Sequence, residues 1–479
     1  MPRKARSLPS GDADFYRRAA LAVFSNPFGD EFRAVIREIE SECGARVAAL
    51  EERGMSELRK YAGEERETMR MVLLFDAYQR FRPALDDLVV AQVAAGDSPV
   101  TARFSRDLLS LLQRRGFDAD EALRLFAIFF QVRRAHHFIV EGLVGESACM
   151  REFRRRLWDN VFTHDIRIFE RCLWSRMEDF STLLLGETGT GKGTAAAAIG
   201  RSGFIPFDAR KQCFAESFTR SFVSINLSQF PETLIESELF GHRKGAFTGA
   251  VEAHEGIFAR CSPHGAIFLD EIGEVSAPVQ IKLLRVLQER VFSPVGSREE
   301  VRFRGRVIAA TNKAPDGLRG AGGFRDDFYY RLCSDTITVP PLRQRLREDA
   351  RELDALLAHI MDRVAGDAAP GLLPLVRGGL RALARAPYEW PGNVRELEQA
   401  VRRILLTRSY AGESAPASPD RASRLAASVA GGTLDADALL GGYCALLYER
   451  CGNLEEVARR TNLDRRTVKR YLAIQGAAR

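Results

Sequence analysis

The chain of 479 residues is 46% hydrophobic and 28% charged, a composition that is typical of globular domains and excludes a mostly disordered chain. Its length suggests about three domains. Residues 459–479 hold seven Lys or Arg and one acid, so this tail accounts for the whole net charge of +6. A basic tail on a neutral body favours nucleic acid as a partner, and a solvated basic helix is the alternative.

Targeting signals and cysteine spacing bear on the compartment. No apolar run approaches the ~20 residues that span a bilayer, and the basic start of the chain lacks the apolar segment of a secretory signal. The eight cysteines form no CxxC pair and do not stand at zinc-ligand spacing beside histidines. Disulfides and a structural zinc site are therefore disfavoured, and we predict a cytoplasmic protein with no membrane partner.

Residues 1–142 are predicted to form an all-helical N-terminal domain. Apolar residues such as Leu108, Leu111 and Leu112 recur at helical spacing, and no strand-like run or glycine-rich loop interrupts them. The region has no acids arranged on strands as in a phosphorylation receiver. Three roles of this helical domain stay open: it binds a ligand, a partner protein or the neighbouring domain.

A different pattern begins at residue 143, where short apolar runs alternate with helical stretches. Strands separated by helices predict a parallel α/β sheet covered on both faces, which we assign to residues 143–345. Residues 346–410 keep only helical periodicity. Residues 411–433, with 16 Ala, Gly, Ser or Pro in 23 positions, predict a flexible linker, and residues 434–479 a small helical domain. The five predicted strands are Thr182–Leu185, Phe222–Asn226, Ala266–Leu269, Val307–Ala310 and Thr336–Val339.

A glycine-rich loop follows the first predicted strand and precedes an Ala-rich helix. In such a P-loop, backbone N–H groups wrap phosphates, the helix N-terminus adds positive potential and the Lys reaches the β- and γ-phosphates. The loop therefore predicts an ATP site, with a glycine-rich turn as the alternative. Gly193 stands where most P-loops place a Ser or Thr that binds Mg²⁺. The predicted nucleotide-binding residues are Gly186, Glu187, Thr188, Gly189, Thr190, Gly191, Lys192, Gly193 and Thr194.

Two adjacent acids, Asp270 and Glu271, end the third predicted strand. At the carboxyl end of a parallel strand, the first carboxylate can hold Mg²⁺ through water and the second can activate an attacking water. Asn312 ends the next strand, where an amide can orient water near the γ-phosphate. Arg325 and Arg331 are candidate arginine fingers for the transition state, and surface salt bridges are the alternative.

Three further motifs are Glu236–His242, the hexapeptide Gly245–Ala250 and the segment Trp390–Leu397. With these motifs the sequence resembles, from about Leu143 to Tyr410, the bacterial enhancer-binding proteins, the AAA+ activators of sigma-54 RNA polymerase, in which the third motif is the sensor II segment. Small residues around the Phe and Thr of the hexapeptide also favour, by themselves, a flexible loop with an apolar tip that contacts a partner. A buried aromatic in a β-turn is the alternative. The hexapeptide is Gly245, Ala246, Phe247, Thr248, Gly249 and Ala250.

The resemblance implies an ATPase that works with ATP and Mg²⁺ in a ring, usually a hexamer, and whose hexapeptide contacts the sigma factor. It also implies a role for each of seven residues. Asp270 and Glu271 would form the Walker B pair, Asn226 would be a switch residue contacting Glu271, Asn312 would be sensor I, Arg395 would sense nucleotide, and Arg325 and Arg331 would act across a subunit boundary.

The chain departs from the pattern of that family in four places. Gly193 replaces the Glu that usually follows the P-loop Lys, and Leu227 replaces a common Cys after the switch Asn. Extra residues stand before the P-loop, around His164–Met177, and before the second strand, around Ile205–Phe218.

The basic C-terminal segment predicts a helix-turn-helix. A helix over Leu454–Thr461 is followed by a tight turn and a second helix that begins at Arg465. The pair resembles the Fis-type module common at the C-terminus of that family, and a generic basic hairpin is the alternative. Residues expected to face double-stranded DNA are Arg465, Arg466, Thr467, Lys469 and Arg470.

We therefore predict an α/β protein with an AAA+ P-loop sheet and a helical lid, preceded by an all-helical domain and followed by a small helical DNA-binding domain. Its predicted function is ATP-dependent activation of sigma-54 RNA polymerase from upstream DNA. Two alternatives stay open. One is a DNA-binding regulator that uses nucleotide only as a switch, which the Asp270–Glu271 pair disfavours. The other is a different AAA+ remodelling ATPase, which the hexapeptide disfavours.

Overall fold

The computed structural model describes residues 13–22, 26–314, 318, 323–381, 388–410, 412, 421–432 and 434–474. Its contacts divide the chain into two compact units, Met1–Tyr410 and Ala411–Arg479. Within the described ranges, no helix combines the length and apolarity needed to cross a membrane.

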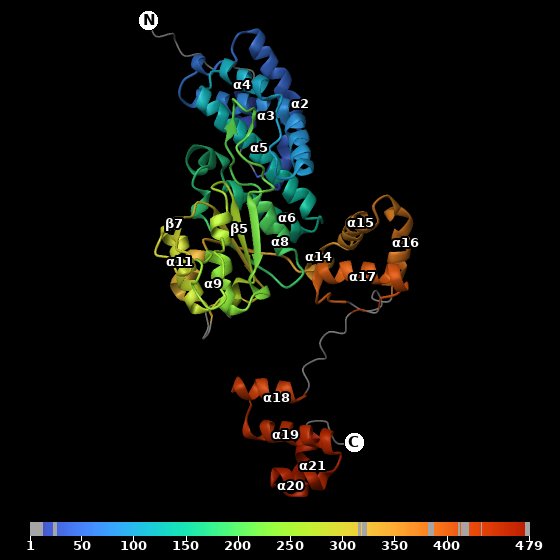
Figure 1. Ribbon diagram of the computed structural model, residues 1–479. Coiled ribbons are helices and arrows are strands. Elements are labelled where there is room, and N and C mark those ends of the chain that lie inside the picture. Colours follow the sequence, from blue (N-terminus) through green and yellow to red (C-terminus); the bar gives the residue numbers. More distant parts are fainter. Residues whose placement is uncertain are drawn as a thin grey trace. The chain divides into compact units, whose positions relative to one another are not determined.

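The N-terminal part of the first unit is helical, as predicted (Figure 1). Its core is formed by aliphatic and aromatic side chains of these helices. The buried guanidinium of Arg115 donates to the Leu73 carbonyl, 2.7 Å away, and to the carboxylates of Asp76 and Glu51. The elements are α1 (Ala13–Ala22), α2 (Asp30–Glu52), η1 (Leu58–Lys60), α3 (Gly63–Ala95), α4 (Ser105–Arg114) and α5 (Ala119–Gly142).

A five-stranded parallel sheet follows, with the order β4-β5-β8-β1-β9. All five strands predicted from the apolar runs are present, and each bound agrees to within one residue. The strands are β1 (Thr182–Leu185), β4 (Phe222–Asn226), β5 (Ala266–Asp270), β8 (Arg306–Thr311) and β9 (Asp335–Thr338).

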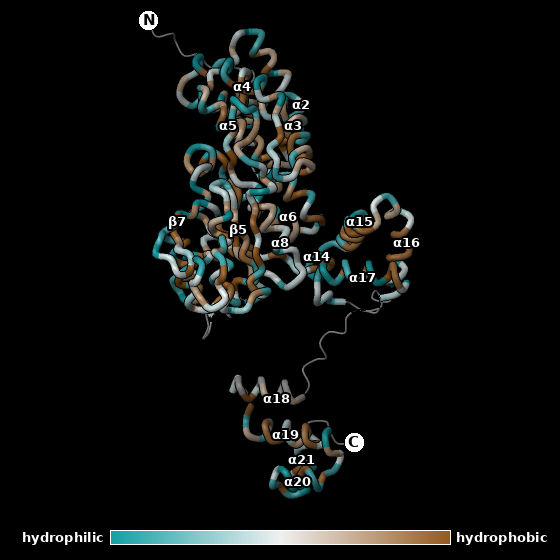
Figure 2. Tube along the Cα trace, viewed as in Figure 1, coloured by the Kyte–Doolittle hydropathy of each residue, from teal (hydrophilic) through white to brown (hydrophobic). Residues whose placement is uncertain are grey.

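Alternate residues of each strand enter two separate cores, because successive side chains point to opposite faces of a sheet. On β5, Phe268 packs with α6 (Ala148–Phe162) and with the P-loop helix α8 (Lys192–Gly200), whereas Leu269 packs with the helices of the other face. Figure 2 shows hydrophobic residues gathered along β5 between these layers. The other face carries α9 (Glu232–Phe240), α10 (Ile257–Arg260), α11 (Ala277–Glu289) and α13 (Asp326–Leu332).

The two inserted segments, around His164–Met177 and Ile205–Phe218, contact the N-terminal helices. The first includes α7 (Ile166–Ile168) and η2 (Phe169–Leu173), and the second forms a hairpin of β2 (Phe207–Asp208) and β3 (Cys213–Phe214). Phe130 of α5 stacks on Phe214 with 4.2 Å between ring centroids, and Arg70 of α3 donates to Glu170 at 2.9 Å. These extra residues therefore have a structural role in attaching the helical domain to the sheet. Shorter elements elsewhere are η3 (Met177–Asp179), η4 (Leu227–Gln229), η5 (Ile272–Glu274), β6 (Val291–Phe292) and β7 (Val301–Arg302).

A helical lid ends the first unit. A buried ion pair, in which Arg345 donates to Glu352 at 2.7 Å, joins its first two helices. Glu352 also accepts from the backbone N–H of Ser147 at 2.6 Å, which ties the lid to the start of α6. The lid consists of α14 (Leu342–Glu348), α15 (Arg351–Ala365), η6 (Gly366–Ala368), α16 (Ala369–Leu380) and α17 (Asn393–Thr407).

The second unit is a small helical body. Val457, Val468 and Leu472 are buried in its core, as the helix-turn-helix prediction requires. A helix, α18, occupies part of the stretch 411–433 predicted as a linker, and residues 411, 413–420 and 433 of that stretch lie outside the described residues. The helices are α18 (Arg421–Ala430), α19 (Ala436–Cys451), α20 (Leu454–Thr461) and α21 (Arg465–Ile474).

Candidate nucleotide site and output surfaces

A cavity of about 470 Å³ lies between the carboxyl ends of the strands and the lid. It brings together groups that the sequence analysis found far apart in the chain. Its wall includes the P-loop from Thr188 to Thr194, both acids at the end of β5, and Asn226 at the end of β4. Arg395 of the lid helix α17 completes the set.

The P-loop has the conformation that an anion site requires. Gly189 and Gly191 have φ values of +80° and +103°, in the left-handed region that favours glycine. Lys192 is buried, and its Nζ donates to the carbonyls of Gly186 at 2.7 Å and Glu187 at 3.2 Å. Burial lowers the pKa of Lys192, and the carboxylates of Glu271 and Asp270 oppose that shift.

Two amides flank these groups. Asn312 of the β8 end donates through Nδ2 to Thr188 Oγ1 at 3.4 Å, which places it beside the P-loop. Asn226 donates to Asp270 Oδ2 at 3.5 Å, and the described residues include no hydrogen bond between Asn226 and Glu271. The expected Asn226–Glu271 contact is therefore replaced by one to Asp270. Glu271 has a left-handed backbone, with φ of +55°, and so leaves the strand geometry that places Asp270 opposite Asn226.

The lid touches the P-loop through main-chain and side-chain hydrogen bonds. The backbone N–H groups of Val394 and Arg395 donate to the Gly189 carbonyl at 3.0 and 3.3 Å. Asn393, fully buried, donates to Glu187 and to the Thr188 carbonyl, both at 3.1 Å. The N-terminus of α17 is thus fixed to the phosphate-binding loop.

Sequence reasoning missed two residues of this contact. Asn393 stands in the sensor II segment, but only its hydrogen bonds to Glu187 and Thr188 show that it joins the lid to the P-loop. Arg343 of α14 donates to both carboxylate oxygens of Glu187, which lowers the pKa of that carboxyl. No local sequence signal marks Arg343, because its partner lies 156 positions away.

Gly193 lies where the family has a larger residue, and the structure has room for one. A Cβ placed there would meet only a ring carbon of Phe268, at 3.9 Å. The adjacent Thr194 and the carboxylate of Asp270 line the same cavity. Oxygen donors are the ligands that Mg²⁺ prefers, so this donor set fits a partly hydrated Mg²⁺ shared with phosphate oxygens.

The two candidate arginine fingers lie outside the wall of this cavity. Arg325 is at the N-cap of α13, with its side chain 47% exposed, and pairs with Asp327 at 2.8 Å. Arg331 is in the last turn of α13, and its Nε donates to the Leu287 carbonyl at 3.0 Å. Neither side chain approaches the nucleotide cavity of its own chain.

The hexapeptide forms an exposed loop between α9 and α10. Gly245 and Gly249 have φ values of +79° and +102°, and the Gly245 N–H donates to the Ala250 carbonyl at 2.8 Å. Phe247 is 38% exposed and contacts His242 edge to face, while Thr248 is exposed. The turn therefore presents its aromatic and hydroxyl side chains on the surface, and the alternative of a buried aromatic is wrong.

The helix α21 presents a basic surface. Arg465, Arg466, Lys469 and Arg470 are exposed, while Val468 between them is buried. Asp464 caps the helix by accepting from the N–H groups of Arg466 and Thr467. The basic side chains are thus directed away from the core of this unit.

Comparison with known proteins agrees with this arrangement. Residues 164–338 match the family described as the sigma-54 interaction domain. The chain is 34% identical over 412 residues to the transcriptional regulatory protein ZraR of Klebsiella oxytoca, which covers 81% of this chain and 82% of that protein. The chain belongs to the bacterial enhancer-binding proteins.

Other enhancer-binding proteins match over shorter stretches. The hydrogenase transcriptional regulatory protein HoxA of Cupriavidus necator is 43% identical over 232 residues, 48% of this chain and 44% of that protein. The Nif-specific regulatory protein of Klebsiella pneumoniae is 41% identical over 266 residues, 56% of this chain and 44% of that protein. The chain thus spans less than half the length of these two relatives. A crystal structure of NtrX from Brucella abortus in complex with ATP is 21% identical, with a TM-score of 0.41, over 78% of this chain and 80% of that chain.

Two glycines of the P-loop provide a matched pair of substitutions. Gly189→Ala should weaken nucleotide binding at least ~10-fold, because the new Cβ would clash with the Gly392 carbonyl and the residue has a positive φ. Gly193→Ala should retain binding, since its Cβ has room. Titration with a fluorescent ADP analogue measures both. Equal affinities for the two variants would contradict the proposed lid contact.

Proposed function

We propose that this enhancer-binding protein hydrolyses ATP in the cavity between sheet and lid and uses the hydrolysis to remodel sigma-54 RNA polymerase at promoters. One observation carries the proposal. A single cavity gathers the P-loop, Asp270, Glu271, Asn226 and Arg395, in a chain that matches the sigma-54 interaction domain. The C-terminal unit is proposed to bind double-stranded DNA upstream of the promoter.

Several groups in and beside the cavity have distinct roles in this mechanism. Lys192 and the P-loop N–H groups hold the phosphates, and Glu271 accepts the proton of the attacking water, which Asn312 orients. Asp270, through water, would hold Mg²⁺, which neutralises phosphate charge when bound. Arg395 lies near Lys192, where it can contact the phosphates of a nucleotide that the lid encloses.

The loop Gly245–Ala250 is the proposed output contact with sigma-54. Its support is the exposure of Phe247 and Thr248 on a turn held by Gly245 and Gly249. The two alternative functions make different predictions. A nucleotide-only switch needs no hydrolysis, and a different AAA+ machine needs no contact with sigma-54.

Glu271→Gln should bind ATP with near-normal affinity and hydrolyse it ~10²–10⁴-fold more slowly, because an amide cannot accept the proton of the attacking water. Phosphate release under single-turnover conditions measures the rate, and equilibrium titration measures the affinity. A variant that turned over at the normal rate would exclude Glu271 as the base.

Action of Arg325 on a neighbouring subunit predicts complementation. Arg325→Ala should impair hydrolysis with little change in nucleotide affinity, because the side chain lies outside its own cavity. Mixing it with Glu271→Gln should restore part of the ATPase rate at interfaces where an intact arginine meets an intact base. Arg351→Ala, whose arginine pairs with Asp349 in a similar exposed ion pair, is the control. Absence of recovery in mixed assemblies would refute action in trans.

A DNA-binding role for α21 predicts a salt-dependent defect. Lys469 is exposed and has no ion pair among the described residues, so Lys469→Ala should weaken DNA binding and reduce the salt slope by about one unit. Arg459→Ala removes a charge that is already paired with Glu456 on α20 and should have a smaller effect. Fluorescence anisotropy at several salt concentrations measures both. Identical slopes for both variants and the parent would contradict the orientation of α21.

Thr248→Ala tests the function most directly. The exposed side chain is separate from the nucleotide cavity, so ATPase turnover should persist while open-complex formation on a sigma-54 promoter is lost. Thr407→Ala, at an exposed threonine in the last turn of α17, is the matched control and should preserve both activities. Promoter opening by Thr248→Ala at the parental rate would overturn the proposed output contact.

A further inference from the structure

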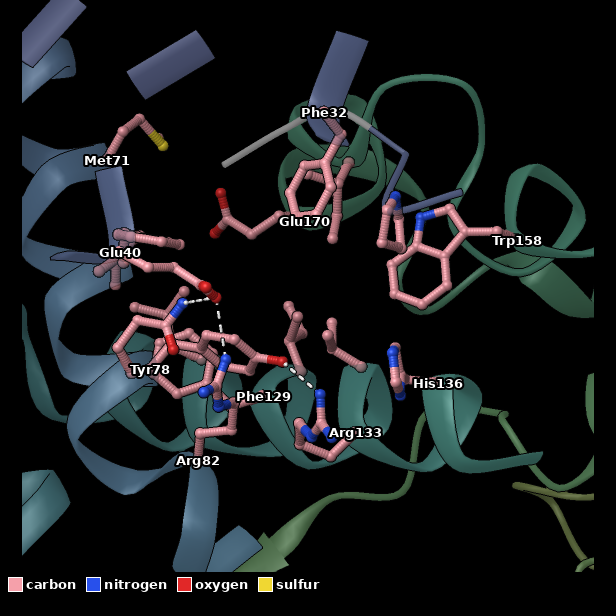
Figure 3. A pocket seen from close by; sticks show the side chains of 18 of the residues that line it. Phe32, Glu40, Met71, Tyr78, Arg82, Phe129, Arg133, His136, Trp158 and Glu170 are labelled. Carbon is pink, nitrogen blue, oxygen red and sulfur yellow. Dashed lines mark hydrogen bonds and ion pairs between the residues drawn. The ribbon is translucent and has the colours of Figure 1, made fainter. Parts of the chain in front are cut away.

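A second cavity, of about 220 Å³, lies among the N-terminal helices and is separate from the nucleotide site. Its wall is formed by α2, α3 and α5, together with Trp158 of α6 and Glu170 of the inserted segment η2. Figure 3 shows Phe32, Trp158 and Phe129 surrounding an open space, with Arg133 and His136 on its lower side. The cavity therefore lies where the N-terminal helices meet the ATPase core.

The cavity has the size and lining for one aromatic ring. A dry cavity of about 150 Å³ in another protein holds benzene, so this one can hold a ring with a small substituent. Phe75, Phe129 and Trp158 in its wall are all buried, and Tyr78 contacts Phe129 edge to face at 5.5 Å. Such walls favour a flat aromatic body, because aromatic rings pack well edge to face or offset.

Two side chains in the wall can each donate a further hydrogen bond to a ligand. Arg70 lines the cavity and its Nη1 is buried with no hydrogen-bond partner among the described residues, although its Nη2 donates to Glu121 and Glu170. The Tyr78 hydroxyl accepts from Arg133 Nη1 at 3.2 Å, so its own proton can be donated to a ligand (Figure 3). A buried donor without a partner costs free energy, which a ligand acceptor would recover.

The charges of the wall are already balanced. Arg82 pairs with Glu40 at 2.9 Å, Arg70 with Glu170 at 2.9 Å, and Arg133 with Asp86 at 2.6 Å. Burial lowers the pKa of His136 to about 4, so its imidazole is neutral near pH 7. A charged ligand would lose its hydration without gaining a free counter-ion, and a neutral ligand is therefore favoured.

Two helices connect this cavity with the nucleotide site. On α5, Arg133 and His136 line the first cavity, and Gly142 at the end of the same helix lines the second. On α6, Trp158 lines the first cavity and Phe153 lines the second. A displacement of either helix by a ligand would thus move atoms of the nucleotide cavity directly.

We propose that this cavity is an effector site for a small neutral molecule with one aromatic ring and one hydrogen-bond acceptor such as a carbonyl, and that its occupancy changes nucleotide affinity. The acceptor is held by Tyr78 and Arg70 and the ring by Phe129 and Trp158. The effect on nucleotide rests on the proposed nucleotide site, whereas binding of the aromatic molecule does not.

Acetophenone, benzamide, ethylbenzene and benzoate, added to the full chain at millimolar concentrations, test the ligand class by saturation-transfer NMR. Acetophenone and benzamide should bind saturably, and benzoate should bind more weakly than either because of its charge. Tyr78→Phe should weaken acetophenone ~5–10-fold, the loss expected for one hydrogen bond, and leave ethylbenzene unaffected. Failure of both neutral carbonyl probes to bind the folded parent, or tighter binding of benzoate, would overturn the assignment of class.

A matched pair of substitutions on α5 tests the location. Val132→Phe places a ring inside the cavity and should abolish acetophenone binding, whereas Val140→Phe makes the same change at an exposed position outside the wall and should not. Far-UV circular dichroism verifies folding of both. If Val132→Phe does not fold, the contrast between acetophenone and ethylbenzene in Tyr78→Phe decides. Equal binding by the two folded valine variants would refute the site.

The proposed effect of the aromatic ligand on nucleotide affinity is measured separately. Saturating acetophenone should change the dissociation constant of a fluorescent ADP analogue ~5-fold or more in the parent and not in Val132→Phe, and ADP should change acetophenone affinity by the same factor. An unchanged constant with acetophenone bound would overturn the coupling. Loss of all nucleotide binding would instead count against the proposed function and leave the NMR result valid.

Discussion

The structure depends on the close approach of the lid helix α17 to the P-loop. Gly189 accepts hydrogen bonds from the first N–H groups of α17, and a side chain at this position would collide with Gly392. The positive end of a helix macrodipole therefore points at the loop that is predicted to bind phosphates. A nucleotide placed here would contact sheet and lid together, which is how its presence can be sensed by the rest of the molecule.

The N-terminal helices belong to the same compact unit as the parallel sheet and the helices around it. Arg70, Phe130 and Trp158 each make contacts across this boundary, through ion pairs or packed rings. The extra segments around His164–Met177 and Ile205–Phe218 supply part of the surface that contacts the helices, through Phe214 and Glu170. Because α5 continues without a break from the helical core to Gly142, a rigid element rather than a linker joins the two parts.

The two proposed contact surfaces, the loop Gly245–Ala250 and the helix α21, are exposed and lie on rigid supports. The loop Gly245–Ala250 is held at its base by hydrogen bonds of His242 with His254 and of Arg243 with Val295. The helix α21 is held by a buried core and by a hydrogen bond from Tyr471 to Asp437. Surface side chains on a rigid backbone lose little additional conformational entropy when they bind a partner.

The sequence alone determined the sheet, the P-loop, the carboxylate pair and the basic C-terminal helix α21. Short apolar runs that end in Asp270 or Asn312, and glycines before Lys192, are local patterns with a direct physical meaning, so no knowledge of distant contacts was needed. The exposure of Phe247 was also predictable in this way, because small flanking residues leave the loop little to pack against.

Only the tertiary structure decided which distant groups meet. Arg343 and Asn393 reach Glu187 across more than 150 positions, and Asn226 bonds to Asp270 rather than Glu271 because the backbone turns at Glu271. The proposed effector cavity likewise depends on Tyr78, Phe129 and Trp158 from three helices. Such groupings come from packing of separate elements, and side-chain periodicity within one element carries no information about its partners.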